Sequence, residues 1–165
     1  MESKAADQVE LSWKRHRLVD IGLELDLLDG PPVSEGAAGG ITYAIQQDRG
    51  VKIRVASGPG SDLAGWRGFY PSQAKRFGGE SVVTVCGTTG RRQEAEVAPE
   101  SATGIYQDPD GKIGHIYHDE PAVVSVAVAF AVRGQPVLVE WAVPAADRER
   151  YRAGEKHFLA SITCL

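Results

Sequence analysis

The segment AVVSVAVAFAVRGQPVLVEWAVP, which spans residues 122–144, decides the fold. Its first part, Val123–Val132, is apolar and rich in β-branched side chains, a composition that favours a β-strand over a solvent-facing helix. Gly134 interrupts the apolar sequence, a second apolar run begins at Val137, and Pro144 ends that run. The segment therefore predicts a β-hairpin built from two long strands.

The residues after Pro144 predict a C-terminal amphipathic helix. Its apolar members recur at helical spacing in a segment otherwise made of charged residues: Tyr151, Phe158, Leu159, Ile162 and Leu165. A helix with one apolar stripe has to bury that stripe against another element. We therefore expect the helix to pack on the sheet, and the rest of the chain has to supply the other strands.

The N-terminal region predicts one long strand followed by a loop. Apolar residues alternate with charged ones through much of Val9–Leu28, and Gly22 suggests a bulge in this strand. The Gly-Pro-Pro sequence at residues 30–32 ends the strand. Residues 34–40 have the composition of a flexible loop.

The central part of the chain predicts short strands joined by tight turns. Three pairs of runs flank turn-forming sequences: 41–46 with 51–55, 81–86 with 91–97, and 105–106 with 113–117. Tight turns join antiparallel neighbours, because parallel neighbours need a long crossover. With about eight strands and helices only in the middle and at the end, the predicted fold class is α+β with a mainly antiparallel β-sheet.

The middle helical segment is predicted to follow a glycine-rich turn. Ser61 or Asp62 can cap a helix that runs toward Phe77, and glycines and a proline divide it into two helical pieces. The preceding sequence, Gly58–Asp62, could cradle an anion with its backbone N–H groups. Pro59 removes one donor and no phosphate-loop lysine follows, so a structural strand-to-helix turn is the favoured interpretation.

Length and charge limit the class of protein. The 165 residues fit one α+β domain, which we assign to residues 9–165 after a disordered tail at residues 1–8. A net charge of −4 argues against nucleic-acid binding, since nucleic-acid-binding proteins usually carry a basic face. The N-terminal residues hold no apolar run long enough for a signal peptide or a membrane span. We expect a cytoplasmic location if Met1 is the native start, and a periplasmic one if a signal sequence has been removed.

The two cysteines leave the redox compartment open. Cys86 ends an apolar run, and Cys164 falls in the predicted C-terminal helix. Two cysteines are too few to indicate a disulfide framework. We therefore expect two buried thiols, with a disulfide between strand and helix as the alternative.

The order of these elements resembles that of the PsbP and Mog protein family. The similarity rests on a strand leading to Gly30-Pro31-Pro32, a central hairpin, a middle helix, a hairpin ending in Val143-Pro144, and a closing helix with Phe158, Leu159 and Ser161. The resemblance implies an α+β fold whose C-terminal helix packs on the sheet. It also implies a non-enzymatic role, because the members are mostly photosystem subunits, nuclear transport cofactors, bacterial lipoproteins and adaptors for secretion-system effectors. No binding motif of the family is matched here.

His115 and His118 are candidates for a metal or catalytic site. Together with Asp119 and Glu120 they offer the nitrogen and oxygen atoms that zinc accepts. On a strand the two histidines point to opposite faces, so a pair of exposed histidines is the favoured interpretation. No serine or cysteine lies in a nucleophile motif, and we assign no catalytic residue, metal or cofactor.

Aromatic and basic residues crowd the glycine-rich middle segment and predict a protein-binding surface. Such side chains commonly anchor interfaces, and so glycine-rich a segment cannot bury a full helical stripe. We expect one or two of the aromatic residues to be exposed; the alternative is that they cap one end of the sheet. The predicted partner-binding residues are Trp66, Arg67, Phe69, Tyr70 and Arg76.

These observations favour a non-enzymatic protein-binding domain whose partner is another protein. It would be an adaptor, or an inhibitor such as an immunity protein that occludes a secretion-system effector toxin. Charge complementarity would speed the encounter of this acidic domain with a basic partner. The alternative is a small hydrolase or ligand-binding enzyme that uses His115 or His118 with nearby carboxylates.

Overall fold

Thirteen strands and two α-helices make up the described part of the chain. The computed structural model describes residues 7–48, 50–69, 75–97, 104–107, 109–116 and 122–165. The strands are β1 (Trp13–Leu18), β2 (Leu23–Leu28), β3 (Ser34–Ala38), β4 (Ile41–Asp48), β5 (Val51–Ser57), β6 (Lys75–Phe77), β7 (Ser81–Val85), β8 (Thr88–Val97), β9 (Gly104–Gln107), β10 (Ile113–Ile116), β11 (Val123–Val132), β12 (Gln135–Pro144) and β13 (Thr163–Cys164). The helices are α1 (Leu63–Phe69) and α2 (Arg152–Ala160), and a 3₁₀ helix at Ala145–Tyr151 precedes α2.

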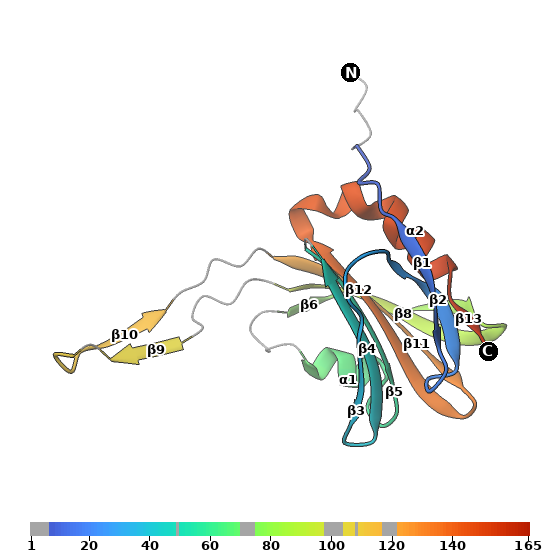
Figure 1. The fold of residues 1–165 in the computed structure, drawn as a ribbon, viewed down its shortest axis with the longest axis horizontal. Coiled ribbons are helices and arrows are strands. Elements are labelled where there is room, and N and C mark those ends of the chain that lie inside the picture. Colours follow the sequence, from blue (N-terminus) through green and yellow to red (C-terminus); the bar gives the residue numbers. More distant parts are fainter. Residues whose placement is uncertain (1–6, 49, 70–74, 98–103, 108, 117–121) are drawn as a thin grey trace.

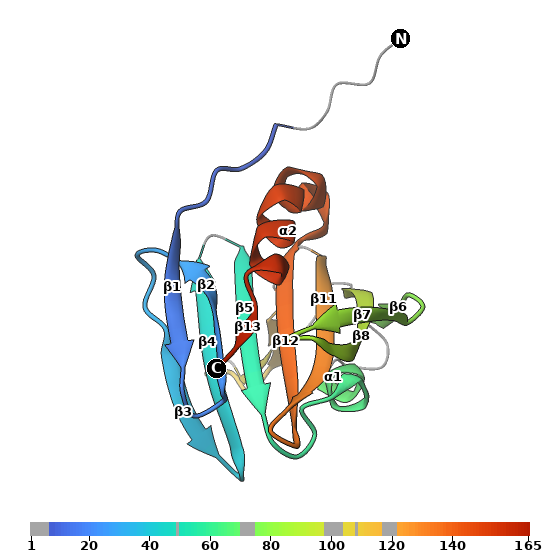
Figure 2. The same cartoon turned by 90° about the vertical axis from the view of Figure 1, so that its right-hand side faces the viewer.

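Most of the strands form one large sheet, and other elements pack on both of its faces. Eight strands make this sheet, in the order β3-β4-β5-β12-β11-β8-β6, with β7 also paired to β8. A three-stranded sheet, β1-β2-β13, and α2 cover one face, while α1 packs on the other (Figure 1; Figure 2). All strand pairs described are antiparallel, so the predicted α+β class with a mainly antiparallel sheet is confirmed. No helix in the described ranges is long and apolar enough to cross a membrane.

The hairpin of β11 and β12 forms the centre of the large sheet, as predicted. Its register runs from Val123 opposite Pro144 to Val132 opposite Gln135. The two-residue turn uses Arg133 and Gly134, both with positive φ, as the turns that match the twist of a hairpin require. Because successive side chains point to opposite faces, both β11 and β12 contribute to the cores on the two sides of the sheet.

The main core lies between the large sheet and the elements that cover it on the side of α2. Three leucines of β2, at positions 23, 25 and 27, have at most 1% of their surface exposed. Phe158 of α2 is fully buried and stacks against Trp141 of β12, with 5.4 Å between ring centroids. The expectation that the C-terminal helix packs on the sheet is therefore confirmed. The helix ends at Ala160, however, and the chain continues into β13.

Two predictions for the N-terminal region are wrong. The long strand is a hairpin of β1 and β2, and Gly22 lies in its turn with a φ of 92° instead of forming a bulge. The predicted loop at residues 34–40 contains β3, which pairs with β4 at the edge of the large sheet. An edge strand made of small and polar residues has no alternation of apolar side chains by which to identify it.

The middle of the chain contains one described helix instead of two helical pieces. Lys75–Phe77 is a strand that pairs with β8, so the predicted helix does not continue to Phe77. The predicted hairpins that became β4–β5, β7–β8 and β9–β10 are all present. Strands β9 and β10 form a separate two-stranded sheet that projects from the body of the molecule (Figure 1).

A disulfide bond joins Cys86 to Cys164. Cys86 lies in the turn between β7 and β8 with a φ of 54°, and Cys164 lies in β13. The expectation of two buried thiols is wrong, because Cys164 follows the last helix instead of lying within it. After α2 the chain turns back along β2, and this return brings Cys164 beside Cys86. The bond therefore connects the small sheet to a turn of the large one.

Helix α1 packs closely against the turn before it, so a methyl group added at Gly65 should strongly lower the free energy of unfolding. A Cβ atom at Gly65 would lie 1.9 Å from the Gly60 carbonyl oxygen, whereas one at Gly68 would meet nothing within 4 Å. Urea unfolding should show that Gly65→Ala lowers the free energy of unfolding by about 3 kcal/mol or more. The control Gly68→Ala should raise it by about 0.5–1 kcal/mol, because alanine is the better helix former. Similar effects of the two changes would contradict this geometry.

Candidate functional site

A buried carboxylate lies under α1. Glu140, in the middle of β12, is 1% exposed on the face covered by α1. Its Oε2 accepts hydrogen bonds from Trp66 Nε1 at 2.7 Å and from Ser125 Oγ at 2.6 Å. Its Oε1 accepts one from Nε of Arg54 at 3.1 Å, and Arg54 lies directly opposite Glu140 in the register of β5 and β12. The carboxylate therefore links α1 to three strands of the sheet, β12, β11 and β5.

The turn at Gly58–Asp62 sets the start of α1. Gly58 has a φ of 122°, and its carbonyl accepts a hydrogen bond from the Ser61 N–H at 3.1 Å. Asp62 Oδ1 accepts one from the Gly65 N–H at 2.8 Å and so caps the helix. The segment is the strand-to-helix turn that the sequence favoured, and Asp62 supplies the cap.

The exposed surface beside α1 combines an aromatic ring with two cations. Phe69, the last residue of α1, exposes 56% of its surface. The Arg54 guanidinium lies 4.7 Å from the centroid of this ring and the Lys52 ammonium 5.8 Å. Tyr43 and Ile45 lie on the same face of the neighbouring strand β4 and are half-buried. We call these five residues the Phe69 surface.

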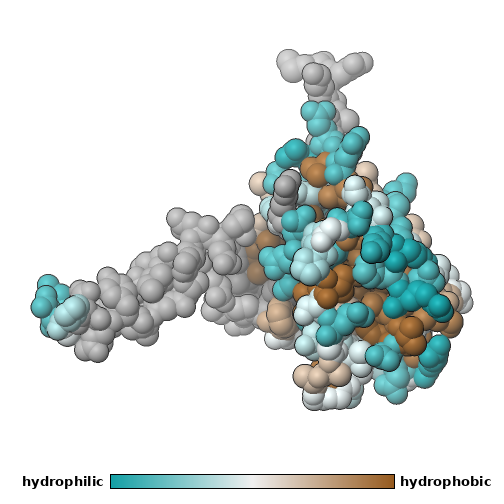
Figure 3. Space-filling model, viewed as in Figure 1, coloured by the Kyte–Doolittle hydropathy of each residue, from teal (hydrophilic) through white to brown (hydrophobic). Residues whose placement is uncertain are grey.

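The residues predicted to bind a partner differ in exposure. Trp66 is fully buried, so its ring supports the Phe69 surface from beneath instead of reaching a partner. Arg67 is half-buried, Phe69 and Arg76 are exposed, and Tyr70 lies outside the described residues. The exposure of Phe69 agrees with the expectation for a glycine-rich segment. On the face of the body visible in Figure 3, hydrophobic residues form separate patches between hydrophilic ones.

Arg67 ties α1 to β8 and to Glu80, which precedes β7. Its Nη1 donates to Glu80 Oε1 at 2.9 Å and to Gln93 Oε1 at 2.8 Å. Arg91 Nη2 donates to the second oxygen of Glu80 at 3.1 Å. These contacts, above all the hydrogen bond from Arg67, hold the pKa of Glu80 below its usual value. Arg67 is therefore engaged in holding α1 and has a structural role in this conformation.

A second charged cluster lies beside the 3₁₀ helix. Arg148 donates to both oxygens of Glu94, at 2.8 and 2.6 Å. Arg92 donates to Glu94 at 3.0 Å and to the buried Glu155 at 3.3 Å. The hydrogen bond from Arg148 lowers the pKa of Glu94, and the same contact raises the pKa of Arg148. The cluster thus fastens the start of the C-terminal helical segment to β8.

This cluster predicts a loss of stability in acid. Because the folded state lowers the pKa of Glu94, its contribution is present above the unfolded-state pKa of about 4.3 and is lost as the pH falls through the folded pKa. Solvent screening limits that contribution to about 1 kcal/mol. Urea unfolding between pH 7 and pH 3 should show a smaller acid-induced loss for Glu94→Gln than for the wild type. Glu96→Gln, at an exposed position of the same strand, serves as the control. Equal losses in wild type and Glu94→Gln would contradict the role of the pair.

The structure gives no geometry for the predicted histidine site. His115 lies in β10, whereas His118, Asp119 and Glu120 lie outside the described residues. Within the described ranges, no group of three or more His, Cys, Asp or Glu residues is arranged to hold a metal ion. The hydrolase alternative therefore gains no support from a described contact.

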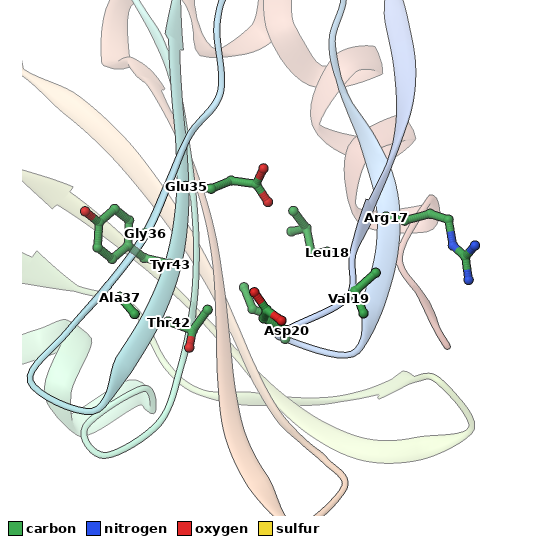
Figure 4. Close-up of a pocket in the computed structure, with 10 residues that line it drawn as sticks. Arg17, Leu18, Val19, Asp20, Glu35, Gly36, Ala37, Thr42 and Tyr43 are labelled. Atoms are coloured by element: carbon green, nitrogen blue, oxygen red, sulfur yellow. The ribbon is translucent and has the colours of Figure 1, made fainter.

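A groove of about 440 Å³ opens between the β1–β2 turn and the β3–β4 pair (Figure 4). The Glu35 carboxylate and the Leu18 side chain point into the space between the two strand pairs, whereas Arg17 points away from it (Figure 4). Asp20 lies at the turn and also lines the groove. Neither Asp20 nor Glu35 forms an ion pair with another residue in the part of the chain that the structure describes. The groove is therefore an acidic recess beside an edge strand.

The solved structures that resemble this chain include two proteins of similar architecture along nearly its whole length. The solution structure of cyanobacterial PsbP from Synechocystis superposes with a TM-score of 0.57 and 11% sequence identity, covering 99% of this chain and 98% of that one. The chain shares its fold with PsbP. The Ran-binding protein Mog1p of Saccharomyces cerevisiae superposes with a TM-score of 0.52 and 12% identity, covering 94% and 96% of the two chains. No protein-family model and no curated protein sequence matches the chain.

Sequence reasoning missed Glu140 and the groove. A single carboxylate at the centre of the apolar run Val137–Val143 was the available signal for Glu140, because such a residue needs a partner when buried. The groove could not be foreseen, because one of its walls is β3, which the sequence predicted to be a loop. The predicted aromatic segment and the buried carboxylate nevertheless belong to one structural unit, since Trp66 contacts Glu140 directly.

Proposed function

We propose that this chain is a non-enzymatic protein-binding domain that acts as an adaptor or inhibitor by covering part of another protein. The observation that carries the proposal is the exposed ring of Phe69, with Arg54 and Lys52 beside it. Aromatic and arginine side chains contribute most of the binding energy at protein interfaces. The buried contacts of Trp66 and Glu140 hold α1 in place, so the ring is presented on a fixed support.

The chemistry of the Phe69 surface indicates what it would bind. Its cations suit a partner segment with an apolar side chain next to carboxylates, while the net charge of −4 would steer a basic protein toward the domain as a whole. An effector toxin neutralised by occlusion is the specific partner that we propose. The likeness to Ran-binding Mog1p supports a role in protein binding only by analogy of fold.

Purification of the tagged chain from its native host tests the proposal. We expect a stoichiometric protein partner that is retained by the wild type and by Val82→Ala, a control at an apolar residue of similar exposure on β7. Phe69→Ala should weaken the complex about tenfold or more, as truncation of an interface anchor does. Equal retention by Phe69→Ala, or the lack of any stoichiometric partner, would refute the proposed surface.

The two forms of the proposal differ in what happens to the partner. If the chain is an inhibitor, adding it at a one-to-one ratio should abolish the toxic activity of the purified partner, and Phe69→Ala should restore that activity. If the chain is an adaptor, the partner should keep its activity and lose solubility or delivery when the chain is removed. Activity assays at increasing molar ratio distinguish these outcomes.

The disulfide supports a location in an oxidising compartment. Both cysteines of the chain are joined in one bond, and disulfides persist in periplasmic and extracellular proteins but are rare in the cytoplasm. We therefore propose that the domain works in the periplasm. Detection of the oxidised form in a periplasmic extract, with thiols blocked on lysis, is the expected result; free thiols confined to the cytoplasmic fraction would contradict it.

A further inference from the structure

Strand β3 ends the large sheet on one side. It pairs with β4 continuously from Ser34 to Ala38, without a bulge, and no described strand pairs with its outer edge. The backbone N–H and C=O groups along such an edge can pair with another strand. Gly36, Ala37 and Ala38 carry little or no side chain, so a second backbone can approach closely. The edge is therefore a suitable template for an added strand.

Natural proteins usually protect an edge of this kind with lysine, proline, a bulge or an inward-pointing charge. β3 carries one device of this kind, the Glu35 carboxylate, which points into the groove (Figure 4) and disfavours an added strand that offers it no cation. A strand added along β3 would point every second side chain toward the same side as Glu35. Those side chains would enter the groove lined by Asp20 and Leu18. Two carboxylates that lack ion-pair partners among the described residues favour a cation at that position.

The same carboxylate disfavours a second copy of this chain at the edge. Antiparallel pairing of two β3 strands about Gly36 would place both Glu35 side chains on one face, near each other across the strands. The two carboxylates would repel each other, so pairing between the β3 strands of two copies is disfavoured. A strand that carries a positive charge is favoured instead. The occupant that fits is a strand from another protein that carries a basic residue.

We propose that β3 accepts an extended segment of a partner protein as an additional strand, with a lysine or arginine side chain of that segment seated in the groove beside Asp20 and Glu35. This site shares Tyr43 of β4 with the Phe69 surface, but its carboxylates and its edge strand are separate from Phe69, Arg54 and Lys52. Main-chain hydrogen bonds would supply affinity, and the acidic groove would supply specificity.

Selection of random nine-residue peptides on the folded, oxidised chain tests this site. We expect enrichment of alternating sequences with lysine or arginine, and an enriched peptide should shift the backbone amide NMR signals of residues 34–38. Glu35→Lys should weaken that peptide about tenfold or more and should select peptides with acidic residues instead. Glu10→Lys, at an exposed position outside β3 and the groove, should leave the affinity unchanged.

Several results would overturn the proposal. These are no enrichment over the starting library, enrichment without basic residues, signal changes away from β3, and equal binding by the wild type and Glu35→Lys. Dimers in sedimentation experiments that Glu35→Lys strengthens and the peptide displaces would identify the edge as a contact between copies, which also contradicts it. Phe69→Ala should not affect the peptide, so failure at this site is distinguishable from failure of the proposed function.

Discussion

Replacing Glu140 by alanine is expected to lower the free energy of unfolding by about 3–5 kcal/mol. The change removes the acceptor for Trp66 Nε1 and Ser125 Oγ, and it removes the charge that faces the half-buried Arg54. Buried donors that lose their acceptor retain the full cost of desolvation. Urea unfolding followed by circular dichroism measures the effect, and Glu10→Ala, at an exposed position, should change stability by less than about 0.5 kcal/mol.

A double-mutant cycle separates the ion pair from the rest of this cluster. Glu140→Ala combined with Arg54→Ala should destabilise less than the sum of the two single changes, because the second change removes a charge already left without its partner. Glu140→Gln, which keeps an oxygen acceptor, should be milder than Glu140→Ala. Additive effects would show that Arg54 and Glu140 are not coupled, and a Glu140→Ala protein as stable as the wild type would show that the carboxylate does not hold α1.

Breaking the disulfide is expected to lower the free energy of unfolding by about 2–4 kcal/mol. The bond joins residues separated by 78 positions, so it restricts a large part of the unfolded chain. The variant with Cys86→Ser and Cys164→Ser should match the reduced wild type and should not respond to dithiothreitol. If dithiothreitol leaves the unfolding curve of the wild type unchanged although both thiols become free, the bond does not stabilise the fold.

The sequence correctly predicted the strands whose composition or alternation of apolar side chains indicates that one or both faces are buried. The hairpin of β11 and β12 combines β-branched residues with a Gly-containing turn, and both signals are local. The boundary between β1 and β2 was missed because Val19 and Ile21 continue the alternation of the flanking strands through the turn. In the structure Val19 is 63% exposed, so an apolar residue alone did not indicate a strand there.

The candidate site was predictable only where it depends on local sequence. The glycines predicted that one or two aromatic residues of the segment would be exposed, but not that Phe69 would be exposed and Trp66 buried. The cations beside the Phe69 ring come from β5 and depend on how the strands pair. The disulfide likewise joins two segments that only the return of the chain after α2 brings together. Contacts between distant segments are set by topology, which periodicity does not encode.

Because Val97 pairs with Val123, the segment that contains the β9–β10 hairpin begins and ends at neighbouring positions of the sheet and could be deleted. Val97 ends β8 directly opposite Val123, the first residue of β11, so a two-residue Asn-Gly turn could replace residues 98–122. A chain shortened in this way should keep the body intact, and an unrelated module could be grafted at the same junction. Natural variation in chain length is thus expected to concentrate at this junction, where a segment can be inserted or deleted without a change in the rest of the fold.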